Sequence, residues 1–213
     1  EEAKLVQLTN LETQADGVTV MATAVEVMNL GMGRPLGGAF TPDGTLYIAD
    51  TLLGLIRVKN PLDPRAKVEL VASRVKVDGQ WSQIHYCNDL KVGPKTGKVY
   101  FSDATELSPD RTGTRTWDSL YTSKVDLIRG RRTGRVLEYD PATDEVKVLM
   151  DDLWFANGIG VDKDESFIVV SESFRGQVLK YTFSDSSKSV VLGRLTGYPD
   201  GNDCNHNTGL CYV

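Results

Sequence analysis

The chain has 213 residues, a formal net charge of −5, 40% hydrophobic residues and 25% charged residues. This balance is ordinary for a soluble globular protein, and no basic stripe is present to neutralise the phosphates of a nucleic-acid partner. No apolar run approaches the ~18 residues that a membrane-spanning helix needs.

Two features bear on the surface and on the cellular context. Four arginines fall in a predicted loop and strand start, and we expect them to form a solvated surface: Arg129, Arg131, Arg132 and Arg135. The chain begins at Glu1 without a recognisable targeting segment. We expect it to be part of a longer protein, and its compartment is not defined by these residues.

The first predicted elements in chain order are strands. Residues 17–22 and 25–27 alternate between apolar and polar positions, as strands with one buried face do. A first full repeat then covers about 34–79 and includes the turn Pro42-Asp43-Gly44. Its four predicted strands, joined by turn residues, end at Phe40 or cover 46–50, 54–58 and 68–72.

Two further repeats follow the same plan. The second covers about 84–153, with predicted strands that end at Val92 and Ser102 or cover 134–140 and 145–149. The third covers about 155–198, with predicted strands at 158–161, 167–171, 176–181 and 189–192. Partial units remain at 1–32 and 199–213.

Four-stranded units that recur every 40–70 residues with almost no helix are typical of a β-propeller. Propellers close four to eight blades into a ring, so three whole blades and two partial ones predict an incomplete arc of an all-β protein. The second repeat carries an insertion, 104–133, in which apolar residues from Trp117 to Ile128 fall at helical spacing. We expect one short amphipathic helix that packs over the sheets, with Trp117 and Tyr121 in the core or, alternatively, lining a pocket.

One position recurs at a constant offset in the repeats. It lies four residues before the last residue of the first strand of each repeat. These positions are Leu36 before Phe40, Asn88 before Val92 and Asn157 before Val161. The same offset before Cys204 in the partial fourth unit gives Asp200. First strands of propeller blades line the central axis, so we expect these side chains to converge at one end of it.

Two amide oxygens and one carboxylate suit a hard cation, and calcium accepts six to eight oxygen ligands in irregular geometry. Asn88, Asn157 and Asp200 are therefore candidate calcium ligands. The alternative is that Asn and Asp at strand starts only bond nearby backbone groups. His85 is expected to be a loop residue at the rim rather than a ligand.

The three cysteines, Cys87, Cys204 and Cys211, leave at least one thiol unpaired. Cys204 and Cys211 are predicted on neighbouring strands of one hairpin. A turn around 205–209 would offset them, and because disulfide geometry is demanding we do not expect a bridge there.

Several motifs resemble those of strictosidine synthase-like proteins, in the family's order and spacing over about 33–213. They are Gly33–Gly37 (GRPLG), Asn88–Leu90 (NDL), Thr96–Asp103 (TGKVYFSD), Thr133–Pro141 (TGRVLEYDP), Phe155–Gly158 (FANG) and Tyr198–Gly201 (YPDG). The chain looks most similar to the adipocyte plasma membrane-associated protein branch, which is grouped with paraoxonases, gluconolactonases and regucalcin-like proteins. The resemblance implies a six-bladed propeller with calcium on its axis.

In metal-dependent relatives the ion is bound by residues that match Asn88, Asn157 and Asp200. A family glutamate from the first blade has no match here, and Gly201 stands where a further asparagine is expected, with Asn202 next to it. Leu36 replaces the paraoxonase histidine. The glutamate of true strictosidine synthases would lie beyond Val213.

The leading functional hypothesis is a calcium-dependent hydrolase of esters or lactones acting on a small-molecule substrate. Asp89 would be a neighbouring base or would orient a ligand, and the insertion would cover the pocket. Two alternatives stay open: a strictosidine synthase-type condensation of an amine with an aldehyde, and a non-catalytic binding propeller. The resemblance suggests the secretory pathway, endomembranes or the vacuole.

Overall fold

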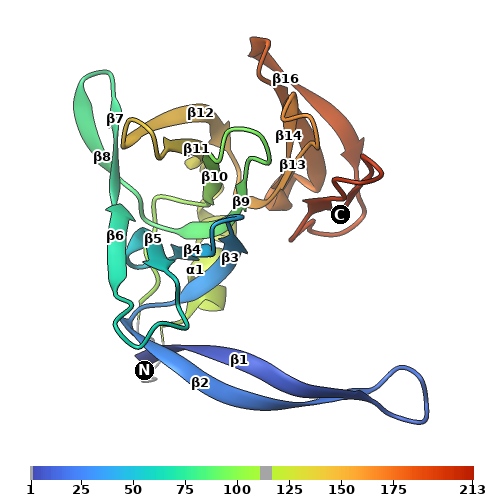
Figure 1. The fold of residues 1–213 in the computed structure, drawn as a ribbon. Helices are drawn as coiled ribbons and strands as arrows, with labels where there is room; N and C mark the ends of the chain where they lie inside the picture. Colours follow the sequence, from blue (N-terminus) through green and yellow to red (C-terminus); the bar gives the residue numbers. More distant parts are fainter. Residues whose placement is uncertain (1, 111–116) are drawn as a thin grey trace.

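The structure is a computed structural model that describes residues 2–110 and 117–213. Its main body contains three four-stranded antiparallel sheets, here called blades 1 to 3, whose strand order follows the chain (Figure 1). Blade 1 contains β3 (Pro35–Phe40), β4 (Thr45–Asp50), β5 (Gly54–Lys59) and β6 (Val68–Ala72). Blade 2 contains β9 (Cys87–Val92), β10 (Val99–Asp103), β11 (Gly134–Asp140) and β12 (Glu145–Leu153). Blade 3 contains β13 (Ala156–Val161), β14 (Phe167–Glu172), β15 (Gln177–Thr182) and β16 (Asp185–Arg194).

Shorter elements complete the described fold. Three two-stranded sheets pair β1 (Glu2–Thr13) with β2 (Val20–Met32), β7 (Arg74–Val77) with β8 (Gln80–Gln83), and β17 (Asp203–Cys204) with β18 (Cys211–Tyr212). The β1–β2 hairpin extends away from the blades (Figure 1). Its strands reach further than predicted, but 16–19 form part of its turn rather than a strand. The helices are α1 (Ser119–Arg129) and the single-turn η1 (Ser173–Arg175).

The core lies between the faces of neighbouring blades. Because side chains alternate along a strand, Phe101 of β10 packs with Tyr47 and Leu55 of blade 1, whereas the preceding Tyr100 packs with Ile168 of blade 3. Both faces of the middle blade are therefore covered. This explains why β10 is buried along its whole length and has no solvent-exposed face.

The first strands of the blades lie beside one another, in the order β3, β9, β13. Gly37 of β3 has no room for a side chain, since a Cβ there would lie 2.8 Å from the Cα of Asp89 and 2.9 Å from the carbonyl oxygen of Asn88. This close approach brings the backbones of blades 1 and 2 together at equivalent positions of the repeat. The described residues thus form an incomplete β-propeller, as predicted.

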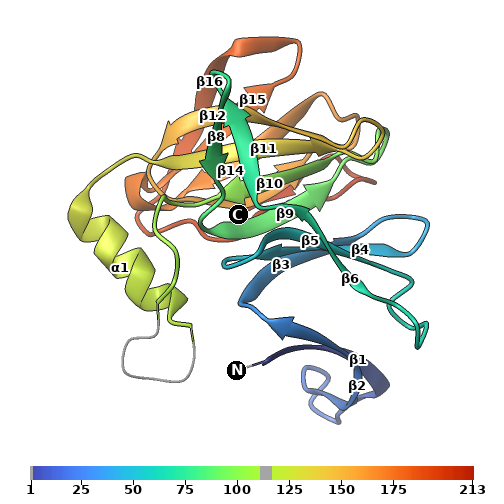
Figure 2. The same cartoon turned by 90° about the vertical axis from the view of Figure 1, so that its left-hand side faces the viewer.

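The predicted helix forms, but its orientation differs from the expectation. It projects beside the blades at the end where β10 stops and β11 begins (Figure 2). Its buried residues are Thr122 and Asp126, whereas Leu120, Tyr121 and Ile128 are exposed. A hydrogen bond from Thr105 Oγ1 to Asp126 Oδ1, 2.6 Å long, fixes the polar face inward. The prediction that Tyr121 packs in the core was therefore wrong.

The four arginines of the predicted solvated surface all form ion pairs. Arg129 and Arg131 both pair with Glu106, and Arg132 pairs with Asp152 at 2.8 Å. Arg135 is largely buried and forms an ion pair with the buried Asp103, while its guanidinium also donates to the backbone of the β7–β8 hairpin. This last arginine holds the hairpin to blade 2, so for Arg135 the prediction was wrong.

None of the helices in the described ranges is both long enough and apolar enough to cross a membrane.

Candidate functional site at the starts of the first strands

The four equivalent repeat positions lie in a row. Gly37, next to Leu36, packs on the backbone of Asn88 and Asp89. Gly158, next to Asn157, packs on the backbone of 200–202, and its amide donates to the carbonyl oxygen of Asp200 at 2.8 Å. The constant offset read from the sequence therefore corresponds to neighbouring places in three blades and the following segment.

Asn88 and Asn157 are in direct contact between blades 2 and 3. The Nδ2 of Asn88 donates to the Oδ1 of Asn157 at 3.0 Å. Asn157 is buried, with 8% of its surface exposed, and Asn88 is partly buried. The two amides meet because each lies near the start of a first strand, where the strands approach the propeller axis.

A buried hydroxyl sets the orientation of the Asn157 amide. Ser173 Oγ donates its only proton to the carbonyl oxygen of Pro199 at 2.6 Å, so it can only accept from Asn157. Asn157 Nδ2 donates to this hydroxyl at 3.0 Å. The amide oxygen of Asn157 must therefore face Asn88 and the axis. The sequence repeat gave no indication of Ser173, which comes from η1 after β14.

Asp200 and Leu36 complete the row. Asp200 is exposed, and its main chain rather than its carboxylate holds it to blade 3. Leu36 is 43% exposed and supplies no oxygen. Blade 1 thus contributes an apolar side chain at the place where blades 2 and 3 contribute amides.

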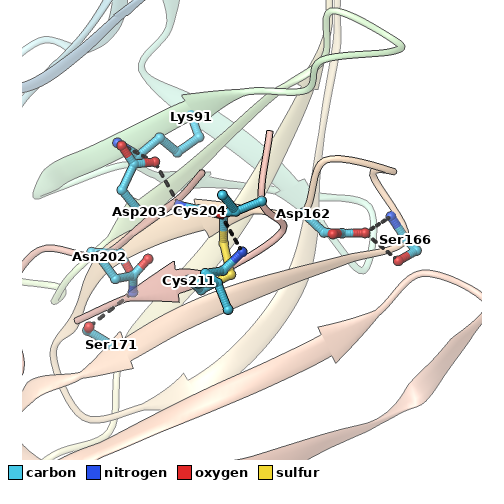
Figure 3. The surroundings of a disulfide bond; sticks show 11 residues. Lys91, Asp162, Ser166, Ser171, Asn202, Asp203, Cys204 and Cys211 are labelled. Carbon is cyan, nitrogen blue, oxygen red and sulfur yellow. Dashed lines mark hydrogen bonds and ion pairs between the residues drawn. A yellow bond between two sulfur atoms is a disulfide. The ribbon is translucent and has the colours of Figure 1, made fainter. Parts of the chain in front are cut away.

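Asn202 lies close to the row but is directed elsewhere. Its Nδ2 donates to the carbonyl oxygen of Gly158 at 2.8 Å and to Ser171 Oγ of β14 at 3.1 Å (Figure 3). Its Oδ1 is buried and has no hydrogen-bond partner among the described residues. The side chain thus fastens the last segment to blade 3 through Gly158 and Ser171.

Asp89 joins two first strands. Its Oδ2 accepts a hydrogen bond from the amide of Ile159 in β13 at 2.9 Å, and Gly37 packs against it from the other side. Burial raises the pKa of the Asp89 carboxyl, and the Ile159 hydrogen bond opposes this only in part. Its visible role is an anchor between blades. This hydrogen bond engages one of the two carboxylate oxygens and goes to the backbone of β13.

The last segment is closed by a disulfide, contrary to the expectation from the sequence. Cys204 and Cys211 face each other in the β17–β18 ladder and are bonded at 2.05 Å (Figure 3). The turn from 205 to 210 places them opposite each other, without the offset that we expected. Lys91 of β9 forms an ion pair with the neighbouring Asp203 at 3.4 Å, and Cys87 is a buried free thiol.

Aromatic side chains form the rim above the amides. Tyr86 and Phe155, each two residues before an asparagine of the site, are in edge-to-face contact with their ring centroids 5.5 Å apart. Burial raises the pKa of Tyr86 to about 12, and its hydroxyl donates to the carbonyl oxygen of Ser119 at the start of α1. The nearby His85 contacts Ser108 and lies outside the amide pair, as expected for a loop residue.

The donor set fits a hard cation better than a transition metal. Within the described ranges no group of three or more His, Cys, Asp or Glu side chains could hold a metal ion. The candidate set has one carboxylate and two amides, with the Asn157 oxygen already held toward the axis. Oxygen-only ligands of this kind suit calcium, provided that the partly buried Asn88 amide turns its oxygen to the same side.

Comparisons with known proteins agree with this architecture. The family model for strictosidine synthase matches residues 88–186. The adipocyte plasma membrane-associated protein of Salmo salar is 36% identical over 171 residues, which cover 79% of this chain and 38% of the relative. Protein STRICTOSIDINE SYNTHASE-LIKE 4 of Arabidopsis thaliana is 33% identical over 168 residues, covering 79% of this chain and 40% of the relative.

Solved structures show the same fold. A gluconolactonase from Xanthomonas campestris superposes with a TM-score of 0.62 at 16% identity, covering 92% of this chain and 59% of that one. The blades thus define the chain as part of a β-propeller. By its matched residues it belongs to the strictosidine synthase-like family, and it spans about two fifths of the length of the curated relatives above.

Proposed function

We propose that the chain contributes the calcium site of a hydrolase that acts on esters or lactones. The observation that carries the proposal is the contact between Asn88 and Asn157, with the Asn157 oxygen held toward the axis by Ser173. The exposed Asp200 adds a negative charge at the same end. The structural similarity to a gluconolactonase supports a lactone or a related ester as the substrate class.

The residues have distinct roles in this proposal. Asn157 holds a preset oxygen, Asn88 supplies a second one from the neighbouring blade, and Asp200 supplies charge. A bound calcium ion would provide a Lewis acid that polarises the substrate carbonyl and stabilises negative charge on its oxygen.

Calcium binding tests the proposal directly. We expect isothermal titration calorimetry to show binding by the chain, and Asn88→Ala and Asn157→Ala each to abolish it or to weaken it at least about tenfold, since each removes one oxygen ligand. Asn207→Ala, in the exposed β17–β18 turn, is the matched control and should bind as the unchanged chain does. A chain that binds no calcium, or binding that is indifferent to both amides, would exclude the proposed site. An ester and lactone screen follows only from a positive result.

A further inference from the structure

The rim of the site repeats as regularly as the site itself. Two residues before Leu36, Asn88, Asn157 and Asp200 stand Arg34, Tyr86, Phe155 and Tyr198, respectively. The close approaches of Gly37 and Gly158 place the four repeat positions side by side, so the four preceding residues share one end of the blades. Three are aromatic and one is cationic.

The aromatic residues form one continuous stack. Phe174 of η1 joins Phe155, with ring centroids 4.6 Å apart, to Tyr198, with ring centroids 5.9 Å apart. Tyr86 and Phe155 are buried at 3% and 5% exposure, whereas Tyr198 is 66% exposed. The buried rings therefore form a base, and Tyr198 is its solvent-facing end.

The stack is held in place by an unusual backbone conformation. Phe155 has a φ of 63°, in the left-handed region that bulky residues rarely adopt. Its carbonyl oxygen accepts a hydrogen bond from the amide of Ser173 at 3.1 Å. Strained residues of this kind concentrate where a side chain must point in a particular direction, here toward Tyr86 and Phe174.

Arg34 presents an unused cation beside this stack. Its carbonyl oxygen accepts from the amide of Thr51 at 3.1 Å and from its hydroxyl at 3.2 Å, which fixes the backbone. Its side chain is exposed and forms no ion pair or hydrogen bond within the described part of the chain. Arg34 also lines a cavity of about 160 Å³ together with Gly33, Pro35 and Trp117, and with Glu2, Ala3 and Lys4 of β1.

Arg34 and Asp200 both lie close enough to Tyr86 for their charges to act on its hydroxyl. The positive charge of Arg34 lowers the pKa of the Tyr86 hydroxyl and the negative charge of Asp200 raises it, both as minor contributions beside burial. An arginine that is not ion-paired within the described part of the chain can form a paired, charge-assisted contact with a ligand carboxylate. An exposed ring backed by other rings offers a flat apolar surface at little entropic cost.

We propose that Arg34 and Tyr198 determine substrate specificity, selecting esters or lactones that carry both a flat apolar group and a carboxylate. The apolar group lies on Tyr198 and Phe174, and the carboxylate pairs with Arg34. This inference rests on the proposed hydrolase, because only an enzyme has a substrate. The recognition of the ligand can be measured separately, as binding.

The test uses two probes that cannot be hydrolysed as esters, 4-phenylbutanoate and its neutral amide, measured by calorimetry with the full chain. We expect the carboxylate to bind more tightly than the amide. Arg34→Gln should remove this preference by weakening the carboxylate about tenfold or more and leaving the amide unchanged. Tyr198→Ala should weaken both probes by a similar factor, because it removes the apolar surface that both use.

Two variants serve as controls. Arg65→Gln removes an exposed arginine from the loop after β5, at the opposite end of blade 1, and Tyr212→Ala removes an exposed tyrosine from β18. Both should leave the two affinities unchanged. Equal binding of carboxylate and amide by the unchanged chain, or a preference that survives Arg34→Gln, overturns the inference. If the preference follows Arg34 but no ester or lactone is hydrolysed with calcium present, the proposed hydrolase fails and the recognition site stands.

Discussion

The orientation of a single amide depends on a single hydroxyl at this site. Asn157 could present either its oxygen or its nitrogen to the axis, and the two would have opposite effects on a cation. Ser173 decides between them because its proton is already donated to the carbonyl oxygen of Pro199. The hydroxyl therefore acts on a ligand through its neighbour, as partners of metal ligands commonly do.

Removing this hydroxyl should weaken calcium binding without removing a ligand. We expect Ser173→Ala to raise the calcium Kd about tenfold, because the Asn157 amide is no longer restrained. The buried carbonyl of Pro199 also loses its donor, at a cost of about 1 kcal/mol in folding free energy. Calorimetry and urea denaturation measure the two effects. Ser123→Ala is the control, because the Ser123 hydroxyl donates within α1 to the carbonyl oxygen of Leu120. An unchanged Kd for Ser173→Ala would show that the amide orientation does not depend on the Ser173 hydroxyl.

Among the elements, the turn between β13 and β14 joins blade 3 to blade 2 through the side chain of Glu165. This contact is here called the latch. Glu165 in this turn accepts hydrogen bonds from the amides of Lys95 and Thr96 at 2.9 and 3.0 Å. It also accepts from the hydroxyls of Thr96 and Tyr100. Gly93 packs so closely on the carboxylate that a side chain there would collide with it. One carboxylate thus gathers four donors of the neighbouring blade.

This latch should make blade docking sensitive to acid. Burial raises the pKa of Glu165, but the hydrogen bonds from Thr96, Tyr100 and the two backbone amides outweigh it, so the folded-state pKa lies below the usual value of 4.5. The stabilisation is therefore present above pH 4.5 and is lost as the pH falls through the lower folded-state pKa.

We expect Glu165→Gln to lower the free energy of unfolding by about 1–2 kcal/mol at pH 7, measured by urea denaturation, because charge-assisted hydrogen bonds become neutral ones. The difference from the unchanged chain should shrink at pH 3. Glu145→Gln, at the exposed start of β12, should have no effect at either pH. If the difference in unfolding free energy between Glu165→Gln and the unchanged chain is the same at both pH values, the charge of Glu165 does not contribute to the latch.

The comparison of sequence and structure shows which elements follow from local pattern. The strands of blades 1 to 3 were predictable because turn residues separate short apolar runs, as at Asp43-Gly44 before β4. Which face of α1 is buried could not be predicted in this way. It depends on the hydrogen bond between Asp126 and Thr105, which lies 21 residues earlier in the chain. The same holds for Arg135, whose burial depends on Asp103 of the adjacent strand.

The candidate site was predictable only as far as the repeat extends. A constant offset placed Asn88 beside Asn157, because equivalent positions on adjacent blades must be neighbours. Ser173 lies in η1, outside the first strands, and carries no repeat signal. The disulfide was missed for a related reason. Whether Cys204 faces Cys211 depends on the length and shape of the turn at 205–210, which strand periodicity does not define.

On the scale of the whole molecule, the disulfide bears on where the protein folds. We propose an oxidising compartment such as the secretory pathway, because thiols are kept reduced in the cytosol. The bonded hairpin follows Asp200 closely in the chain, and the joining residues are held to blade 3 by a main-chain hydrogen bond and by Asn202. Closing its loop restricts the unfolded chain and favours this docked arrangement.

Counting thiols tests this proposal. When the chain is produced through a secretory pathway and denatured without reductant, we expect mass spectrometry to find one alkyl label, on Cys87, because Cys204 and Cys211 are bonded. Reduction before labelling should give three. The folded, unreduced chain should take up no label, since Cys87 is buried and burial raises the pKa of its thiol, so little reactive thiolate forms. In the variant Cys204→Ser the thiol of Cys211 has no partner, so the denatured, unreduced chain should carry two labels. Three labels on the unchanged chain, denatured and unreduced, would contradict both the bond and the compartment.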